Sequence, residues 1–230
     1  MKTIVIAKTK GGVGGSMLCY NLALYAAAEG TPVCLIDRDP QETLTKMWAA
    51  RSELITPVLI DDVESVARSV KVLTSAKNYD RQFLFVDTPG SMIPIIVDAI
   101  SAADLIVAPM QPNAVDLWGQ DALLDLIEKS DLAHRTLFVL TRTSSTKWGV
   151  EEIEKAKKHL RKSSPYPIQV MPERVDYRRA AEKGRAPWEI NKDRRDIKAE
   201  IGEIWDAVLK AMKKASTETR EASNVIQLTR

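Results

Sequence analysis

The chain has little of the material that builds disulfide frameworks, cysteine or histidine metal centres, or membrane spans. It contains two cysteines and two histidines in 230 residues, too few for a disulfide scaffold or a Cys/His metal site. Cys19 and Cys34 are expected to be buried, reduced thiols. No apolar run approaches the roughly 20 residues that a membrane-spanning helix needs, and the first run is too short for a secretory signal. These absences predict a cytoplasmic protein without a membrane partner.

Length and composition predict one soluble domain. Of the 230 residues, 45% are hydrophobic and 28% are charged, as in a globular protein with one substantial core. We expect residues 1–214 to form that domain. Residues 215–230 are rich in Ser, Thr and Glu, and we expect them to form a polar tail that frays.

Strand-like and helix-like segments alternate along the chain. Expected strands lie at 3–7, 33–37, 57–60, 83–87, 105–108, 136–140 and 168–171, and expected helices at 17–28, 41–52, 61–77, 93–102, 114–129, 148–162 and 193–214. This alternation predicts an α/β fold with a mostly parallel central sheet of about seven strands and helices on both faces.

A glycine-rich loop joins the first expected strand to the first expected helix. Residues 9–16 read Thr-Lys-Gly-Gly-Val-Gly-Gly-Ser. The backbone N–H groups of such a loop, with the positive end of the helix dipole, stabilise an anion such as phosphate. In the general phosphate-binding pattern, G-x-x-x-x-G-K-[ST], a lysine reaches the β- and γ-phosphates and the hydroxyl ligates Mg²⁺. Here Gly14 and Ser16 match, but Gly15 stands in the lysine position.

Carboxylates follow two further expected strands. Asp37 and Asp39 lie at the end of the strand at 33–37, and Asp87 ends the strand at 83–87. Ligands of open α/β sheets bind at the carboxyl ends of the strands, so all three are candidates for the phosphate site. For Asp37 and Asp39, ordinary solvated positions at a strand end are the alternative.

A lysine at the front of the loop connects these motifs to one family. Lys10-Gly11-Gly12-Val13-Gly14-x-Ser16 resembles the deviant Walker A loop of ParA/MinD-type ATPases, and the chain looks closest to the ParA-like partitioning proteins. The segments 33–41 and 83–90 resemble that family's second motif and its Walker B strand. The resemblance implies a P-loop NTPase fold with ATP or ADP and Mg²⁺ as cofactors.

The resemblance also implies a role for individual residues. Lys10 would reach across a dimer interface to the partner's nucleotide, Asp39 would orient the attacking water, and Mg²⁺ would be held by Ser16, Asp87 and Asp39. The residues implied to contact nucleotide are Lys10, Gly11, Gly12, Val13, Gly14, Gly15, Ser16, Met17, Pro172 and Glu173. Asp116 and Trp118 could face the nucleotide or the dimer partner, and for Trp118 packing in the core is the alternative.

Gly15 departs from the family pattern and predicts weakened nucleotide binding with slow or absent hydrolysis. Losing one preorganised charge contact commonly costs about 2.7–4 kcal/mol of transition-state stabilisation, or 10²- to 10³-fold in rate. The loop amides, Mg²⁺ and Lys10 remain available to hold a nucleotide. Restoring a lysine at position 15 is therefore expected to raise affinity and turnover.

Positive charge gathers in the last third of the chain. Residues 1–146 carry a net charge of −4, whereas residues 147–214 carry +6, within a total of +2. Such a basic region is typical of binding to the phosphate backbone of DNA without sequence readout, and solvated helix faces with alternating charge are the alternative. The candidate DNA contacts are Arg161, Lys162, Arg178, Arg179, Arg194 and Arg195.

Taken with the resemblance, the sequence predicts a ParA-like partitioning or positioning ATPase. Its expected partners are a second copy of the chain when ATP is bound, nonspecific DNA, and a ParB-like centromere-binding adaptor, with nucleoid association in the ATP-bound state. One alternative is a nonhydrolysing module in which nucleotide is a structural ligand. Another is a metabolic enzyme of the same superfamily that forms an amide through a phosphorylated intermediate.

Overall fold

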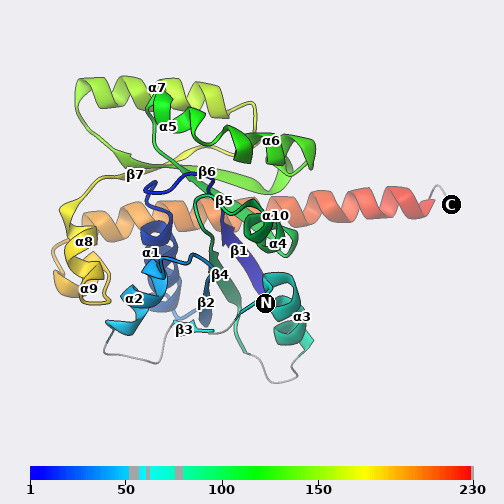
Figure 1. The fold of residues 1–230 in the computed structure, drawn as a ribbon, viewed down its shortest axis with the longest axis horizontal. Helices are drawn as coiled ribbons and strands as arrows, with labels where there is room; N and C mark the ends of the chain where they lie inside the picture. Colours follow the sequence, from blue (N-terminus) through cyan, green and yellow to red (C-terminus); the bar gives the residue numbers. More distant parts are fainter. Residues whose placement is uncertain (52–56, 61–62, 76–79, 229–230) are drawn as a thin grey trace.

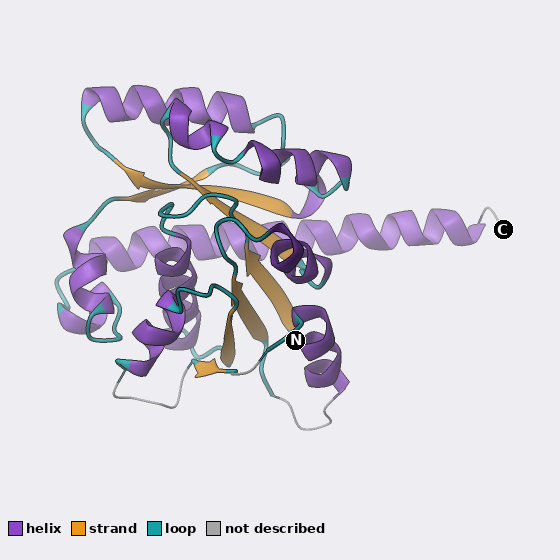
Figure 2. Cartoon of the chain, in the orientation of Figure 1, coloured by secondary structure: helices purple, strands orange, loops and turns teal. Residues whose placement is uncertain are grey.

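Seven parallel strands form one sheet in the order β3-β2-β4-β1-β5-β6-β7 in the part of the chain that the structure describes. The structure is a computed structural model, and it describes residues 1–51, 57–60, 63–75 and 80–228. The strands are β1 (Lys2–Ile6), β2 (Val33–Asp37), β3 (Val58–Leu59), β4 (Phe83–Asp87), β5 (Leu105–Met110), β6 (Thr136–Thr143) and β7 (Gln169–Pro172). The expected α/β fold with a parallel sheet of seven strands is confirmed (Figures 1 and 2).

Helices cover both faces of this sheet. They are α1 (Gly15–Ala28), α2 (Thr43–Ala49), α3 (Val66–Ser75), α4 (Ile93–Ser101), α5 (Ala114–Trp118), α6 (Asp121–Lys129), α7 (Lys147–Leu160), α8 (Val175–Ala181), α9 (Pro187–Ile190) and α10 (Arg195–Leu228), with a 3-10 turn η1 (Ala133–Arg135). One core cluster joins the sheet to α1, α2, α8 and α10, and a second joins the other face to α3, α4, α6 and α7. The central strand β1 is therefore apolar on both faces: Ile4 and Ile6 pack in the first cluster and Val5 in the second.

The two cysteines lie in different parts of the core. Cys19 of α1 and Cys34 of β2 are both buried, and they belong to the clusters on opposite faces of the sheet. Burial raises the pKa of the Cys19 thiol well above its ordinary value, with the nearby Asp87 carboxylate adding to the effect. Cys19 is accordingly held as a neutral thiol that packs as a small apolar side chain.

The helix expected at 114–129 is wrong in one respect, because the structure divides it into α5 and α6. The break falls at Gly119 and Gln120, and the Gln120 side chain is fully buried. Its Oε1 accepts hydrogen bonds from the backbone N and the Oγ1 of Thr9, at 2.8 and 3.0 Å, and its Nε2 donates to the Pro109 carbonyl at 3.1 Å. A continuous helix would carry this amide on its own surface, whereas the break lets it tie the start of the glycine loop to β5.

The chain after β7 also differs from the expectation. Residues 173–192 hold the short helices α8 and α9, which are not among the expected helices. The expected helix at 193–214 begins at Arg195 and continues to Leu228, so α10 extends past the rest of the molecule (Figure 1). Fraying of the segment 215–230 stays a prediction. Among the described residues, no helix is both long and apolar enough to cross a membrane.

Gly184 closes the turn between α8 and α9 against the end of α2. Its φ is 62°, and its carbonyl accepts hydrogen bonds from Tyr20 Oη at 2.9 Å and from Arg51 at 3.0 Å. A Cβ at this position would lie 2.2 Å from the backbone nitrogen of Arg51. The turn therefore needs a residue that has no side chain and tolerates a left-handed conformation.

Replacing Gly184 with alanine is expected to lower the free energy of unfolding by about 2–3 kcal/mol, because strain at positive φ adds to a backbone collision. Urea unfolding of the purified chain measures this. Gly11→Ala is the control, because a Cβ at Gly11 meets no atom within 4 Å. Equal stability of Gly184→Ala and the unsubstituted chain would contradict the prediction.

Candidate functional site

The glycine loop follows β1 and turns directly into α1 at the carboxyl edge of the sheet. Gly12 and Gly14 have φ values of 78° and 80°, a left-handed conformation that glycine adopts without strain. Gly14 is the N-cap of α1, and no side chain caps its first amides. These amides and the helix dipole are thus available to an anion, as the sequence predicted.

A pocket of about 400 Å³ opens beside this loop. Its lining includes most residues predicted for the nucleotide, namely Gly11, Gly12, Gly14, Gly15, Ser16, Met17, Pro172 and Glu173, together with Asp39. Lys10 and Val13 lie outside the lining. Val13 is the loop residue whose side chain is fully buried, and its carbonyl accepts a hydrogen bond from Thr141 Oγ1 at 2.6 Å.

Ser16 and Asp87 meet at the floor of the site. Asp87 ends β4 with its side chain fully buried, and its Oδ2 accepts a hydrogen bond from Ser16 Oγ. Burial raises the pKa of Asp87, although Lys8 and Ser16 both act in the opposite direction. The two side chains for which the resemblance implies a shared Mg²⁺ are therefore in contact at the end of a central strand.

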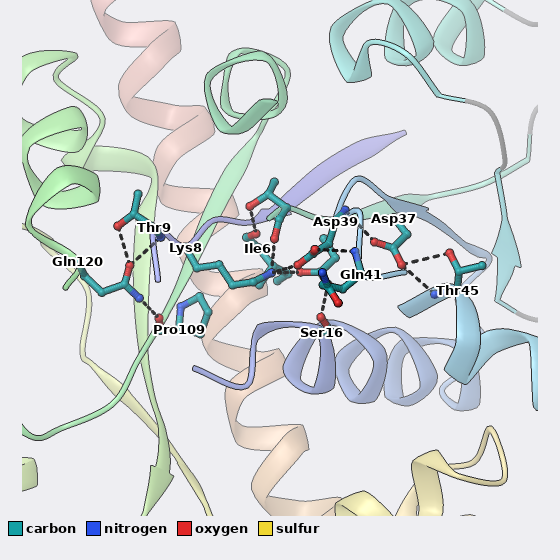
Figure 3. Close-up of polar contacts among 12 residues, drawn as sticks. Ile6, Lys8, Thr9, Ser16, Asp37, Asp39, Gln41, Thr45, Pro109 and Gln120 are labelled. Carbon is teal, nitrogen blue, oxygen red and sulfur yellow. Dashed lines mark hydrogen bonds and ion pairs between the residues drawn. The ribbon is translucent and has the colours of Figure 1, made fainter. Parts of the chain in front are cut away.

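The two aspartates after β2 have different surroundings. Asp37 accepts hydrogen bonds from the backbone N and the Oγ1 of Thr45, at 2.9 and 3.1 Å, and so anchors the start of α2. Asp39 lines the pocket, and its backbone N donates to Asp37 Oδ1 at 3.0 Å. Figure 3 shows Asp37 turned toward Thr45 while Asp39 lies nearer to Ser16. Asp37 is thus a structural residue that helps to position Asp39.

Lys8 is one of the residues of this site that sequence reasoning missed. It lies two residues after the end of β1, its side chain is only 5% exposed, and it lines the pocket. Its Nζ donates to Asp87 Oδ1 at 2.7 Å and to the Thr88 carbonyl, and lies 3.8 Å from Asp39 Oδ2. In Figure 3 the side chain reaches from the end of β1 toward Asp39 and Ser16. The available signal was a lysine just after a buried strand and directly before a loop that has glycine in the usual lysine position.

Lys10 lies on the rim of the site and pairs with a residue of its own chain. Its Nζ contacts Asp116 Oδ1, and its side chain stays 34% exposed. Asn113 caps α5 by accepting a hydrogen bond from the Asp116 backbone N at 2.9 Å, which fixes the carboxylate. Burial raises the pKa of Asp116, but the hydrogen bonds from Lys10 and Asn113 outweigh it and lower the pKa overall. Trp118 is 67% exposed, so of its two readings the alternative of packing in the core does not hold.

The far wall of the pocket comes from the end of β6. Arg142 has a φ of 53°, beside the irregularity at which β6 shifts register against β7. Its guanidinium donates to the Gly12 carbonyl at 2.8 Å and to Glu173 Oε2 at 3.0 Å. Arg142 therefore ties the glycine loop to Glu173, which directly follows Pro172 at the end of β7.

The candidate DNA contacts form two groups. Arg161 and Lys162 precede β7 at the end of α7, whereas Arg178 and Arg179 follow β7 on α8. The strand therefore separates the two pairs. Arg194 contacts Asp176 at 2.5 Å and Asp196 at 3.1 Å, which joins the start of α10 to α8. Arg178, Arg179 and Arg195 are exposed beside this junction.

The N-terminus of α1 opens at the carboxyl edge of a parallel sheet, next to the contact between Ser16 and Asp87. This arrangement defines the class of P-loop nucleotide-binding proteins. The comparisons with known proteins identify the family within this class. The model of the CobQ/CobB/MinD/ParA nucleotide-binding domain matches residues 4–188. The chain therefore belongs to this family, as the resemblance implied.

Individual relatives come from partition systems. Protein ParA of Rhizobium radiobacter is 33% identical over 147 residues, which cover 61% of this chain and 65% of that protein. The chromosome-partitioning ATPase Soj of Thermus thermophilus is 29% identical over 157 residues, or 56% of this chain and 62% of that protein. Each match thus spans slightly less than two thirds of the relative. The structure of pNOB8 ParA bound to nonspecific DNA aligns with a TM-score of 0.67 at 16% identity, covering 92% and 98% of the two chains.

Proposed function

We propose that this chain is a ParA-like ATPase that uses ATP binding to form a dimer on DNA and so positions a cargo. The observation that carries the proposal is that the glycine loop, Ser16 and Asp39 line one pocket, with Asp87 buried behind Ser16 and Lys10 near the loop. ATP would be the natural ligand of such a site, because its phosphates suit the loop and the remaining pocket accommodates a nucleoside.

Mg²⁺ is the metal that this set of donors fits. Ser16 supplies a hydroxyl and Asp87 a carboxylate, already in contact with each other, and Mg²⁺ prefers oxygen ligands completed by water and phosphate. When bound, the ion would neutralise charge on the phosphates. Asp39, on the pocket wall, would accept a hydrogen bond from a water molecule and orient it. These assignments follow the family resemblance and the positions of the side chains.

Calorimetric titration of ATP with Mg²⁺ into the chain, followed by phosphate release with DNA present, tests this function. Binding with turnover supports a working ATPase. Binding without turnover supports the nonhydrolysing module, which the glycine at position 15 favours. Absence of ATP binding would refute both functions.

The rim of the pocket supports a dimer contact. Val115 and Trp118 on α5 are 65% and 67% exposed, and they flank Asp116, the residue that Lys10 contacts. Large exposed apolar side chains of this kind are typical of surfaces that bind another protein. A partner seated here would compete for Lys10 and could draw its ammonium toward the partner's own phosphates.

Replacing Lys10 with alanine is expected to weaken the ATP-dependent dimer about tenfold or more, because each interface loses a charge directed at phosphate. Light scattering after size exclusion, with ATP and Mg²⁺, measures the dimer. Lys129→Ala is the matched control, because Lys129 is an exposed lysine whose partner is Asp125 on its own helix. Unchanged assembly of Lys10→Ala would contradict the predicted role of this lysine.

For DNA, the junction of α8 and α10 is the stronger candidate surface. Arg179→Glu/Arg195→Glu is expected to lower affinity for nonspecific DNA and to reduce the slope of log K against log salt by about 2, since each lost phosphate contact contributes about 0.9. Arg161→Glu/Lys162→Glu is the matched control at the other end of β7. Fluorescence anisotropy over a salt series measures both variants. If Arg161→Glu/Lys162→Glu lost more DNA affinity than Arg179→Glu/Arg195→Glu, the DNA-binding surface would lie at the end of α7 instead.

A further inference from the structure

The space beside Gly15 is already filled. A Cβ at Gly15 would lie 2.7 Å from Cδ of Lys8 and 3.2 Å from both Cε and Nζ of Lys8. The end of the Lys8 side chain therefore occupies the volume into which a side chain at position 15 would start. Two features that look separate in the sequence, a missing lysine and a lysine seven residues earlier, meet at one point in space.

The ammonium of Lys8 also lies where a phosphate-directed charge is needed. It reaches the pocket wall between the loop and the carboxylates, in contact with Asp87 and near Asp39. A buried lysine is costly unless it is paired and hydrogen bonded. Here residues of the chain itself meet both conditions, so the protein holds the Lys8 side chain in place.

We propose that Lys8 supplies the phosphate contact that Gly15 cannot make, so that the lysine of the P-loop has moved from the start of α1 to the end of β1. This inference rests on the proposed function, in that the ligand is a nucleoside triphosphate. When the nucleotide binds, its β- and γ-phosphate oxygens accept hydrogen bonds from the Lys8 ammonium and from the loop amides. The glycine at position 15 is then a requirement of the site, because it leaves room for Lys8.

The arrangement changes what a restored lysine at position 15 would do. In the unsubstituted background, Gly15→Lys crowds Cδ of Lys8 and adds a second ammonium to the same small volume. The substitution alone is therefore expected to bring no gain in ATP affinity. The gain is expected only after Lys8 is replaced by glutamine, which is uncharged but can still donate to Asp87.

The test is a cycle of four full-length proteins: the unsubstituted chain, Lys8→Gln, Gly15→Lys, and the double variant. Calorimetry gives the affinities for ATP and for AMP, which lacks the β- and γ-phosphates, and thermal unfolding without nucleotide reports folding. Lys8→Gln is expected to lower the affinity for ATP at least tenfold and the affinity for AMP less than twofold. The double variant is expected to bind ATP with an affinity within about threefold of that of the unsubstituted chain. Lys2→Gln is the matched control, because Lys2 lies at the opposite end of β1 and pairs with Asp104.

The outcomes separate this inference from the function on which it rests. If the unsubstituted chain binds ATP and Lys8→Gln binds it equally well, Lys8 is only a counterion for Asp87 and the inference is overturned. A loss of ATP and AMP affinity to the same extent in Lys8→Gln overturns it too, because a purely structural role would not distinguish the two ligands. If the unsubstituted chain binds neither nucleotide, the proposed function itself fails, and the role of Lys8 fails with it.

Discussion

Replacing Asp87 with alanine is expected to lower the free energy of unfolding by about 3–5 kcal/mol, because it leaves the Lys8 ammonium buried without its main counterion. The pair is almost completely buried, with side-chain exposures of 5% for Lys8 and 0% for Asp87. The remaining carboxylate, that of Asp39, is 3.8 Å away. The Thr88 carbonyl can still accept a hydrogen bond, but it carries no charge to balance the lysine.

Urea unfolding of two variants distinguishes the buried charge from general damage at this position. Lys8→Met/Asp87→Ala removes both charges and is expected to recover most of the stability that Asp87→Ala loses. Asp125→Ala is the control: its partner Lys129 is exposed, and such surface pairs contribute about 0–1 kcal/mol. If the double variant were as unstable as Asp87→Ala, the buried ammonium would not be the cause.

Replacing Gly90 with alanine is expected to lower ATP affinity by at least about tenfold while the core stays folded. A Cβ at Gly90 would lie 2.5 Å from the backbone N of Gly11 and 2.8 Å from its Cα. These are atoms of the phosphate-binding loop itself, so the loop must shift to relieve the collision. Displacements of about 1 Å in a positioned site can cost about 10²-fold in activity.

Gly119→Ala provides the contrast for Gly90→Ala. A Cβ at Gly119 would lie 2.6 Å from Cδ of Lys10, which is the movable end of a side chain rather than the loop backbone. Its effect on ATP binding by the single chain is expected to be less than threefold. Calorimetric titration measures both variants, with thermal unfolding to verify folding. Equal ATP affinity of Gly90→Ala and the unsubstituted chain would contradict close packing of the loop.

Much of the fold could be predicted because its signals are local. The alternating apolar segments predict the parallel sheet. The glycine loop and the aspartates at the strand ends predict the edge of the sheet at which the site lies. The break between α5 and α6 could not be predicted, because it depends on Gln120 bonding to Thr9, 111 residues away. The short helices α8 and α9 were missed because their boundaries depend on packing against α2 and α10, with Gly184 fitting closely against Arg51.

The motifs of the candidate site can be recognised in the sequence, but the contacts between its side chains cannot. In the sequence, Gly15 indicates only the loss of the phosphate-binding lysine, because a motif is compared position by position along the chain. The replacement charge comes from Lys8, seven residues earlier in the connection between β1 and α1, and only the fold brings its Nζ within 3.2 Å of the Cβ position at Gly15. For the same reason Arg142 was missed, since its contact with Gly12 spans 130 residues.

The packing of α10 on α1 has a consequence for how the chain folds during synthesis. The two helices share the same core cluster, in which α1 contributes Leu18, Leu22 and Ala26, yet they are separated by more than half of the sequence. The ribosome makes α1 among the first elements and α10 last, at roughly 5–20 residues per second. The apolar surface of α1 that packs on α10 therefore stays exposed for about ten seconds or longer, until α10 has been synthesised. During that interval the nascent chain is most prone to aggregate and to bind chaperones.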